Sequence, residues 1–69
     1  MPESTYKIIE IVGTSTDSWE QATKNAIQKA TETLKDMRVA EVVKQDVTIE
    51  NGQIQRFRTR LSISFKYHK

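Results

Sequence analysis

The sequence contains no cysteine, which excludes disulfides, thiolate zinc sites, iron–sulfur clusters and cysteine nucleophiles. Its one histidine is His68, so one copy of the chain cannot supply a histidine triad or a metal site with several histidines. The carboxylates occur singly, without the spacing of a calcium-binding loop. These absences predict a protein that is not an enzyme and has no metal site within one chain.

Long apolar runs are also missing. No segment approaches the roughly 20 apolar residues of a membrane span, and the first residues lack the basic and apolar regions of a signal peptide. Lys and Arg number 11 against 9 Asp and Glu, and a net charge of +2 does not indicate a nucleic-acid partner. We therefore expect a soluble cytoplasmic protein with no membrane partner.

The sequence has only two glycines and one proline, with 36% hydrophobic residues, which predicts a single small domain over residues 1–69. A domain of this length buries only about 60% of the surface that its unfolded chain exposes. Because neither disulfides nor a metal can reinforce such a core, association with copies of itself is the leading source of the missing stability.

Hydrophobic periodicity predicts a strand and then a helix. Residues 6–12 are rich in β-branched side chains, and Gly13 is expected to end this strand. Residues 18–36 place apolar side chains at spacings of three and four, which is typical of an amphipathic helix. Asp17, three residues before Glu20, resembles the start of a capping box, and the alternative caps are Ser15 and Thr16.

Alternation with a period of two returns after Met37, and Asn51-Gly52 interrupts it as a type I′ hairpin turn would. Equal pairing on both sides of this turn sets Val42, Ala40 and Arg38 opposite Leu61, Ile63 and Phe65 on the side that suits the helix. The other side then carries the pairs Ile49 with Ile54, Val47 with Arg56, Gln45 with Arg58, Val43 with Arg60, Glu41 with Ser62 and Val39 with Ser64.

These elements predict an α+β fold in β-α-β-β order, with a three-stranded antiparallel sheet wrapped round one helix. The last strand would reach roughly 50 Å at about 3.3 Å per residue. A compact chain of this length has a diameter of about 28 Å. The hairpin must therefore curl round the helix or project into neighbouring copies.

The sheet face away from the helix combines valines, arginines and Glu41. It is either a solvated face or a subunit interface, and Glu41, Arg56 and Arg60 are the residues expected to pair between subunits. A small interaction module that binds a macromolecule through its arginines is the alternative. Phe57 lies on the opposite side of the strand from these arginines, which argues against a stacking site for single-stranded nucleic acid.

Three segments together resemble the dodecin family: YKIIEIVGTS at residues 6–15, AEV at 40–42 and LSISF at 61–65. The resemblance covers nearly the whole chain, and the EIVGTS run is its most specific part. It implies a hollow homododecamer with the sheets inside and the helices outside. It also implies riboflavin or FMN bound in pairs between subunits, stacked on a tryptophan and hydrogen-bonded by a glutamine, for storage or sequestration rather than turnover.

The resemblance places the family's tryptophan at Val39 and its glutamine at Arg58, with Gln45 predicted opposite Arg58. Val39 offers no ring for stacking, so we expect weak flavin binding and a preference for anionic ligands such as FMN, because Arg58 is a cation. The alternative is a shell that binds no ligand, or one that binds a metal or an anion.

Overall fold

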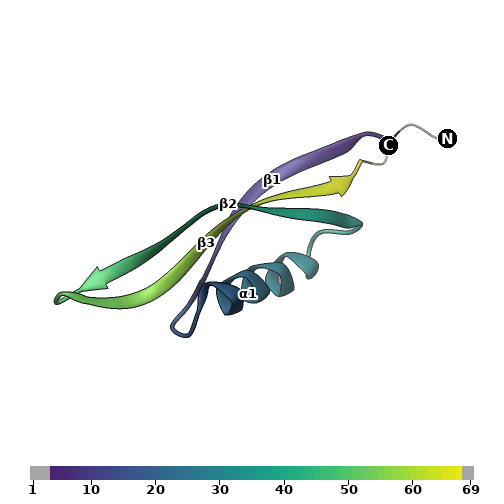
Figure 1. Ribbon diagram of the computed structural model, residues 1–69. Helices are drawn as coiled ribbons and strands as arrows, with labels where there is room; N and C mark the ends of the chain where they lie inside the picture. The colour runs from purple at the N-terminus through teal and green to yellow at the C-terminus, as the bar shows by residue number, and fades with distance from the viewer. Residues whose placement is uncertain (1–3, 68–69) are drawn as a thin grey trace.

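The computed structural model describes residues 4–67 as four elements in β-α-β-β order (Figure 1). The sheet is antiparallel in the order β1-β3-β2, and α1 packs against β1 and β3 on one of its faces. This arrangement confirms the predicted α+β fold. The elements are β1 (Tyr6–Ser15), α1 (Trp19–Thr31), β2 (Met37–Glu50) and β3 (Gln53–Lys66).

The sequence predicted that Gly13 ends β1. The structure shows that this is wrong, because β1 continues through Gly13 to Ser15. A Cβ atom at this position would overlap the carbonyl oxygen of Ala22 and lie 2.7 Å from the Cβ of Ala26. The helix face that meets the sheet is lined by the buried alanines Ala22, Ala26 and Ala30. Small side chains on both surfaces thus let the helix backbone lie almost directly on β1.

The N-cap lies one residue after Asp17, the predicted cap, and is none of the alternatives. Ser18 is the N-cap, and its Oγ accepts a 2.9 Å hydrogen bond from the backbone N–H of Gln21. The Oγ of Ser15 instead accepts a bond from the N–H of Asp17 within the preceding turn. The helix ends at Thr31, earlier than predicted, and Asp36 at a φ of 60° redirects the chain into β2.

The predicted hairpin register is right in two stretches and wrong in the others. The Asn51-Gly52 turn has positive φ at both residues, and the pairs Ile49 with Ile54 and Val42 with Leu61 are confirmed, as are Ala40 with Ile63, Glu41 with Ser62 and Val39 with Ser64. Register shifts interrupt the ladder between Thr48 and Ile49, between Val42 and Lys44, and between Met37 and Val39.

These shifts change four of the predicted pairs. The neighbours of Arg56, Arg58, Arg60 and Phe65 are Thr48, Asp46, Lys44 and Met37, in place of the predicted Val47, Gln45, Val43 and Arg38. Bulges increase local twist, which lets so long a ribbon coil instead of staying flat.

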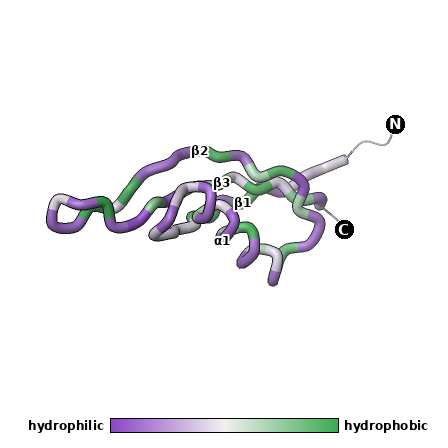
Figure 2. Tube along the Cα trace, turned by 60° about the horizontal axis from the view of Figure 1, so that its bottom comes forward, coloured by the Kyte–Doolittle hydropathy of each residue, from purple (hydrophilic) through white to green (hydrophobic). Residues whose placement is uncertain are grey.

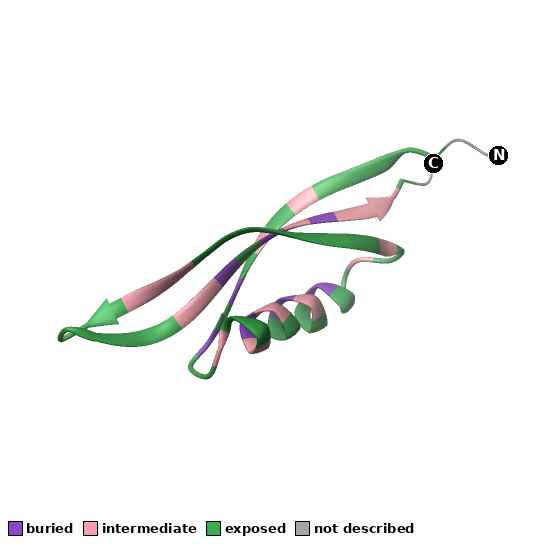
Figure 3. Cartoon of the chain, viewed as in Figure 1, coloured by how far each residue is buried: buried purple, intermediate pink, exposed green. Residues whose placement is uncertain are grey.

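The hairpin projects well beyond the helix (Figures 1 and 3). Its projection into neighbouring copies stays a prediction. The molecule measures 53 × 20 × 16 Å. Its largest fully buried side chains, Thr59, Leu61 and Ile63, lie on β3 where α1 covers the sheet. Hydrophobic segments continue along the projecting hairpin toward its turn, outside this core (Figure 2). Within residues 4–67, no helix combines the length and apolar character needed to cross a membrane.

Candidate binding face

The face of the sheet opposite α1 is here called the uncovered face. On β3 the buried residues Thr59, Leu61 and Ile63 point toward the helix, so the residues between them point away from it. Strand pairing then extends the uncovered face onto both neighbouring strands. It comprises Ile8, Glu10 and Val12 on β1, Arg58, Arg60, Ser62 and Ser64 on β3, and Val39, Glu41, Lys44 and Asp46 on β2.

Arg58 and Asp46 form a two-point ion pair on this face. Arg58 Nε donates to Asp46 Oδ1 at 2.7 Å and Nη2 donates to Oδ2 at 3.0 Å. The hydrogen bonds from Arg58 hold the pKa of the Asp46 carboxyl below its ordinary value, and the same bonds raise the pKa of Arg58. The guanidinium charge is therefore already compensated within the subunit.

Trp19 connects this ion pair to the helix. Its indole Nε1 donates to the backbone oxygen of Asp46 at 3.0 Å, and its ring meets the edge of Phe57 with centroids 5.1 Å apart. Thr59 Oγ1 donates to the backbone oxygen of Trp19 at 3.2 Å. The start of α1 thus anchors the segment of β2 that presents Asp46.

The three predicted ligand-binding residues do not form one site within a subunit. Val39 and Arg58 both lie on the uncovered face, but Gln45 pairs with Thr59 and lies on the helix side. Val39 faces Ser64, and six residues of β3 separate Ser64 from Arg58, which is roughly 20 Å. One small ligand can contact both Val39 and Arg58 only if they come from different copies.

The residue that the sequence reasoning missed is Asp46. It faces Arg58 because β2 carries an extra residue, Val43, between the pairs that involve Val42 and Lys44. Nothing in the local alternation of the sequence marks that bulge. The nearest available signal was a carboxylate directly beside the predicted partner, Gln45.

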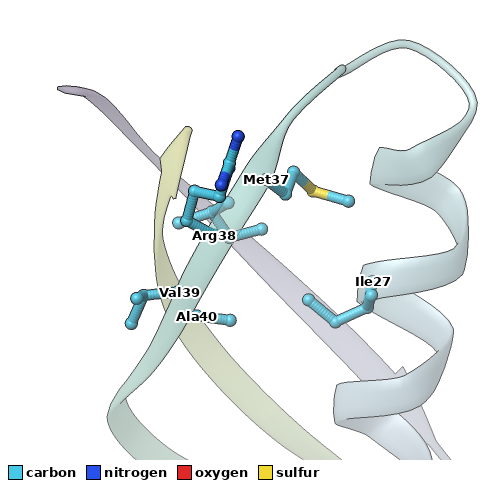
Figure 4. Close-up of a pocket in the computed structure, with 6 residues that line it drawn as sticks. Ile27, Met37, Arg38, Val39 and Ala40 are labelled. Atoms are coloured by element: carbon cyan, nitrogen blue, oxygen red, sulfur yellow. The ribbon is translucent and has the colours of Figure 1, made fainter. Parts of the chain in front are cut away.

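Val39 borders two hollows. One, of about 450 Å³, lies on the uncovered face and is also lined by Tyr6, Ile8, Arg38 and Ser64. The other, of about 240 Å³, opens toward the helix, where Met37, Ala40 and Ile27 approach one another while Val39 points away (Figure 4). Apolar walls with one guanidinium at the rim suit a weakly polar ligand better than a multiply charged one.

The predicted interface residues are exposed, and one already has a partner in its own subunit. Arg60 Nη1 lies 3.4 Å from Glu10 Oε1. Glu41 faces Ser62, which also faces Glu10, so two carboxylates flank one hydroxyl across the three strands. Among residues 4–67, no group of three or more His, Cys, Asp or Glu could hold a metal, and His68 lies outside the described residues.

Comparison with known proteins gives consistent matches. The dodecin family model matches residues 5–68. A protein named calcium dodecin, from Mycobacterium tuberculosis, is 44% identical over 63 residues, which is 91% of this chain and 89% of that protein.

Solved structures give the same result. The dodecin of Streptomyces coelicolor superposes with a TM-score of 0.93 at 35% identity, covering 100% of this chain and 99% of that one. The M. tuberculosis calcium dodecin, described as having a novel calcium-binding site, gives 0.83 at 45% identity, covering 94% and 93%. The fold is thus that of a dodecin subunit. The chain belongs to the dodecin family, which confirms the resemblance seen in its sequence.

Proposed function

We propose that the chain is a non-catalytic subunit that assembles with copies of itself into a hollow homododecamer and binds a small ligand at the uncovered faces. The observation that carries this proposal is the uncovered face. Its apolar residues Ile8, Val12 and Val39 are 61, 45 and 59% exposed, beside two ion pairs. A face with this much exposed apolar surface is typical of an interaction site.

The same face supports weak flavin binding. Val39 has no ring to stack on an isoalloxazine, and stacking on aromatic residues contributes about 1–3 kcal/mol per ring by analogy with nucleic-acid bases. Arg58 is held by Asp46, so it is not a free hydrogen-bonding group. The expected preference for anionic ligands required an unpaired Arg58, and the ion pair weakens that expectation. We expect riboflavin and FMN to bind similarly and weakly.

Calcium is the second candidate ligand, because the relative at 44% identity is named calcium dodecin. Glu10, Ser62 and Glu41 offer oxygen atoms in one row across the sheet. Calcium takes about six to eight oxygens, so three side chains of one subunit are too few, and Glu10 is already shared with Arg60. A calcium site on this face therefore needs carboxylates from a second copy.

Two measurements test these proposals. Light scattering should give a mass near that of twelve subunits, and a monodisperse monomer or dimer at micromolar concentration would refute the shell. Titration with riboflavin, FMN and calcium chloride should separate the ligands, with flavin fluorescence and calorimetry as readouts. Strong quenching by tight riboflavin binding would contradict the weak-flavin proposal. Calcium binding that is unchanged in Glu41→Gln would exclude the carboxylate row.

A further inference from the structure

The accessible surface of the subunit is larger than a compact chain of its mass requires. It measures 5465 Å², whereas a folded monomer of 8.0 kDa is expected to expose about 4,450 Å². The excess of about 1,000 Å² is close to the roughly 800 Å² that each partner contributes to a standard protein interface. The subunit therefore has the surface of a molecule that is completed by other copies.

Part of this excess is the end of the hairpin, here called the hairpin tip and defined as residues 49–54. Ile49 and Ile54 face each other beside the turn and are 68 and 58% exposed. The turn residues Asn51 and Gly52 have φ values of 54° and 75°, as a tight two-residue connection requires. The tip is thus a narrow projection with two isoleucines on it and no helix beside it (Figure 1).

A groove lies at the other end of the subunit, between the edge strand β1 and the last turns of α1. Its volume is about 410 Å³. Lys29 and Glu32 line it and neutralise each other through a 3.4 Å ion pair, so the cleft carries no unbalanced charge. This edge groove is lined mainly by Ile9, Ile11, Val12, Ala26, Ala30 and Leu34.

The tip of a subunit cannot reach its own edge groove. Ile9 in the groove faces Ile63, and ten residues of β3 separate Ile63 from Gln53, which is roughly 33 Å. Contact between the tip and the groove must therefore join two copies. Such a head-to-tail contact uses different surfaces on the two partners and closes into a ring or shell when the rotation between copies allows it.

We propose that the hairpin tip of one subunit inserts Ile49 and Ile54 into the edge groove of the next. The inference rests on the proposed self-assembly and adds which surfaces make the contact. The groove is lined mainly by apolar side chains and carries no unbalanced charge, and the tip offers two exposed isoleucines with Glu50 as its charged residue. The tip is convex, the groove is concave, and neither is covered within the subunit. Their contact would bury apolar side chains that otherwise stay in water.

The absence of cysteine allows a direct test by cross-linking. In the double variant Gln53→Cys/Thr33→Cys, one thiol lies in the tip and the other lines the groove. Mild oxidation should give a ladder of covalently linked chains on a non-reducing gel. The matched control is Gln53→Cys/Lys24→Cys, because Lys24 is exposed on the same helix outside the groove. The control should give no more than dimers.

A second variant measures the energetic role of the tip. Ile54→Asp should raise the concentration at which the assembly dissociates by about tenfold or more, while circular dichroism shows that the subunit stays folded. If the chain assembles but the test variant gives no ladder, or if test and control variants give equal ladders, the tip-and-groove contact is wrong. The proposed shell would stand in either case. A monomer in light scattering for the unmodified chain would overturn both.

Discussion

Arg58 holds Asp46 through two parallel hydrogen bonds, of 2.7 and 3.0 Å, at the position where the dodecin resemblance places a glutamine. The pair lies at the end of the uncovered face nearer the hairpin turn, and the indole of Trp19 donates a hydrogen bond to the backbone oxygen of Asp46. It depends on the bulge at Val43, which brings Asp46 rather than Gln45 opposite Arg58. The guanidinium of Arg58 is therefore engaged by the neighbouring strand.

This pair should make stability depend on pH in the acid range. Pairing lowers the pKa of Asp46 from 3.8, so its contribution is present above that value and is lost as the pH falls through the lower pKa of the folded state. Both side chains are about 40% exposed, which keeps the effect modest. We expect urea unfolding midpoints, measured from pH 7 to pH 2, to be lower in Asp46→Asn than in the unmodified chain at neutral pH. In acid, the midpoint of Asp46→Asn should change less with pH.

The control for that experiment is Glu20→Gln, which removes an exposed carboxylate that pairs with no described cation. Its pH profile should follow that of the unmodified chain. If Asp46→Asn keeps the same acid dependence as the control, the ion pair is not what stabilises the folded state in this range.

Gly13→Ala should destabilise the subunit strongly. The added methyl group would overlap the Ala22 carbonyl oxygen, which is backbone and cannot rotate away. Overpacking of this kind costs about 1–3 kcal/mol in the free energy of unfolding. Gly52→Ala is the comparison, since nothing lies within 4 Å there but φ is +75°, so only backbone strain of about 1 kcal/mol is expected. Equal losses would mean that the helix can move off β1.

Ser18→Ala should lower the free energy of unfolding by about 1 kcal/mol, because it removes the acceptor for the N–H of Gln21. Asp17→Ala, at the position that the sequence favoured as the cap, should have a much smaller effect. Denaturation followed by circular dichroism measures both. A larger loss in Asp17→Ala would show that the capping-box interpretation was right.

Arg60→Glu tests the proposed subunit interface. The change sets a third carboxylate beside Glu10 and Glu41 on the uncovered face, so like-charge repulsion should weaken assembly. Light scattering and the melting temperature of the assembly provide the readout, and Arg60→Gln separates loss of the cation from gain of the anion. An unchanged mass and melting temperature in Arg60→Glu would mean that Arg60 is only solvated.

Flavin binding should be recoverable by restoring the two residues that the resemblance expects. Val39→Trp combined with Arg58→Gln should bring back strong quenching of riboflavin fluorescence, because a ring and an amide return to the uncovered face. Arg58→Gln leaves the carboxylate of Asp46 without its cation, so a triple variant that adds Asp46→Asn removes that unpaired charge. Val39→Trp alone is the control. No quenching in the triple variant would show that this face is not the flavin site.

The sequence by itself determined the features that depend on neighbours along the chain. The β-branched side chains of residues 6–12, the three alanines of the helical stripe and the Asn51-Gly52 turn each encode a local conformation. The overlong last strand also limited the hairpin to curling round the helix or projecting into neighbouring copies, since strand length follows directly from residue count. The resemblance to dodecins was likewise carried by contiguous runs of residues.

Only the tertiary structure decided which side chains meet across the hairpin between residues 43 and 48 of β2. A bulge forms where a long ribbon must twist to follow its neighbours, and the alternation of residues 39–49 is compatible with several registers. The same holds for Gly13, whose place inside β1 depends on how closely the helix approaches. Asp46 faces Arg58, and Gln45 turns to the helix side, because distant packing and not local sequence places the extra residue at Val43.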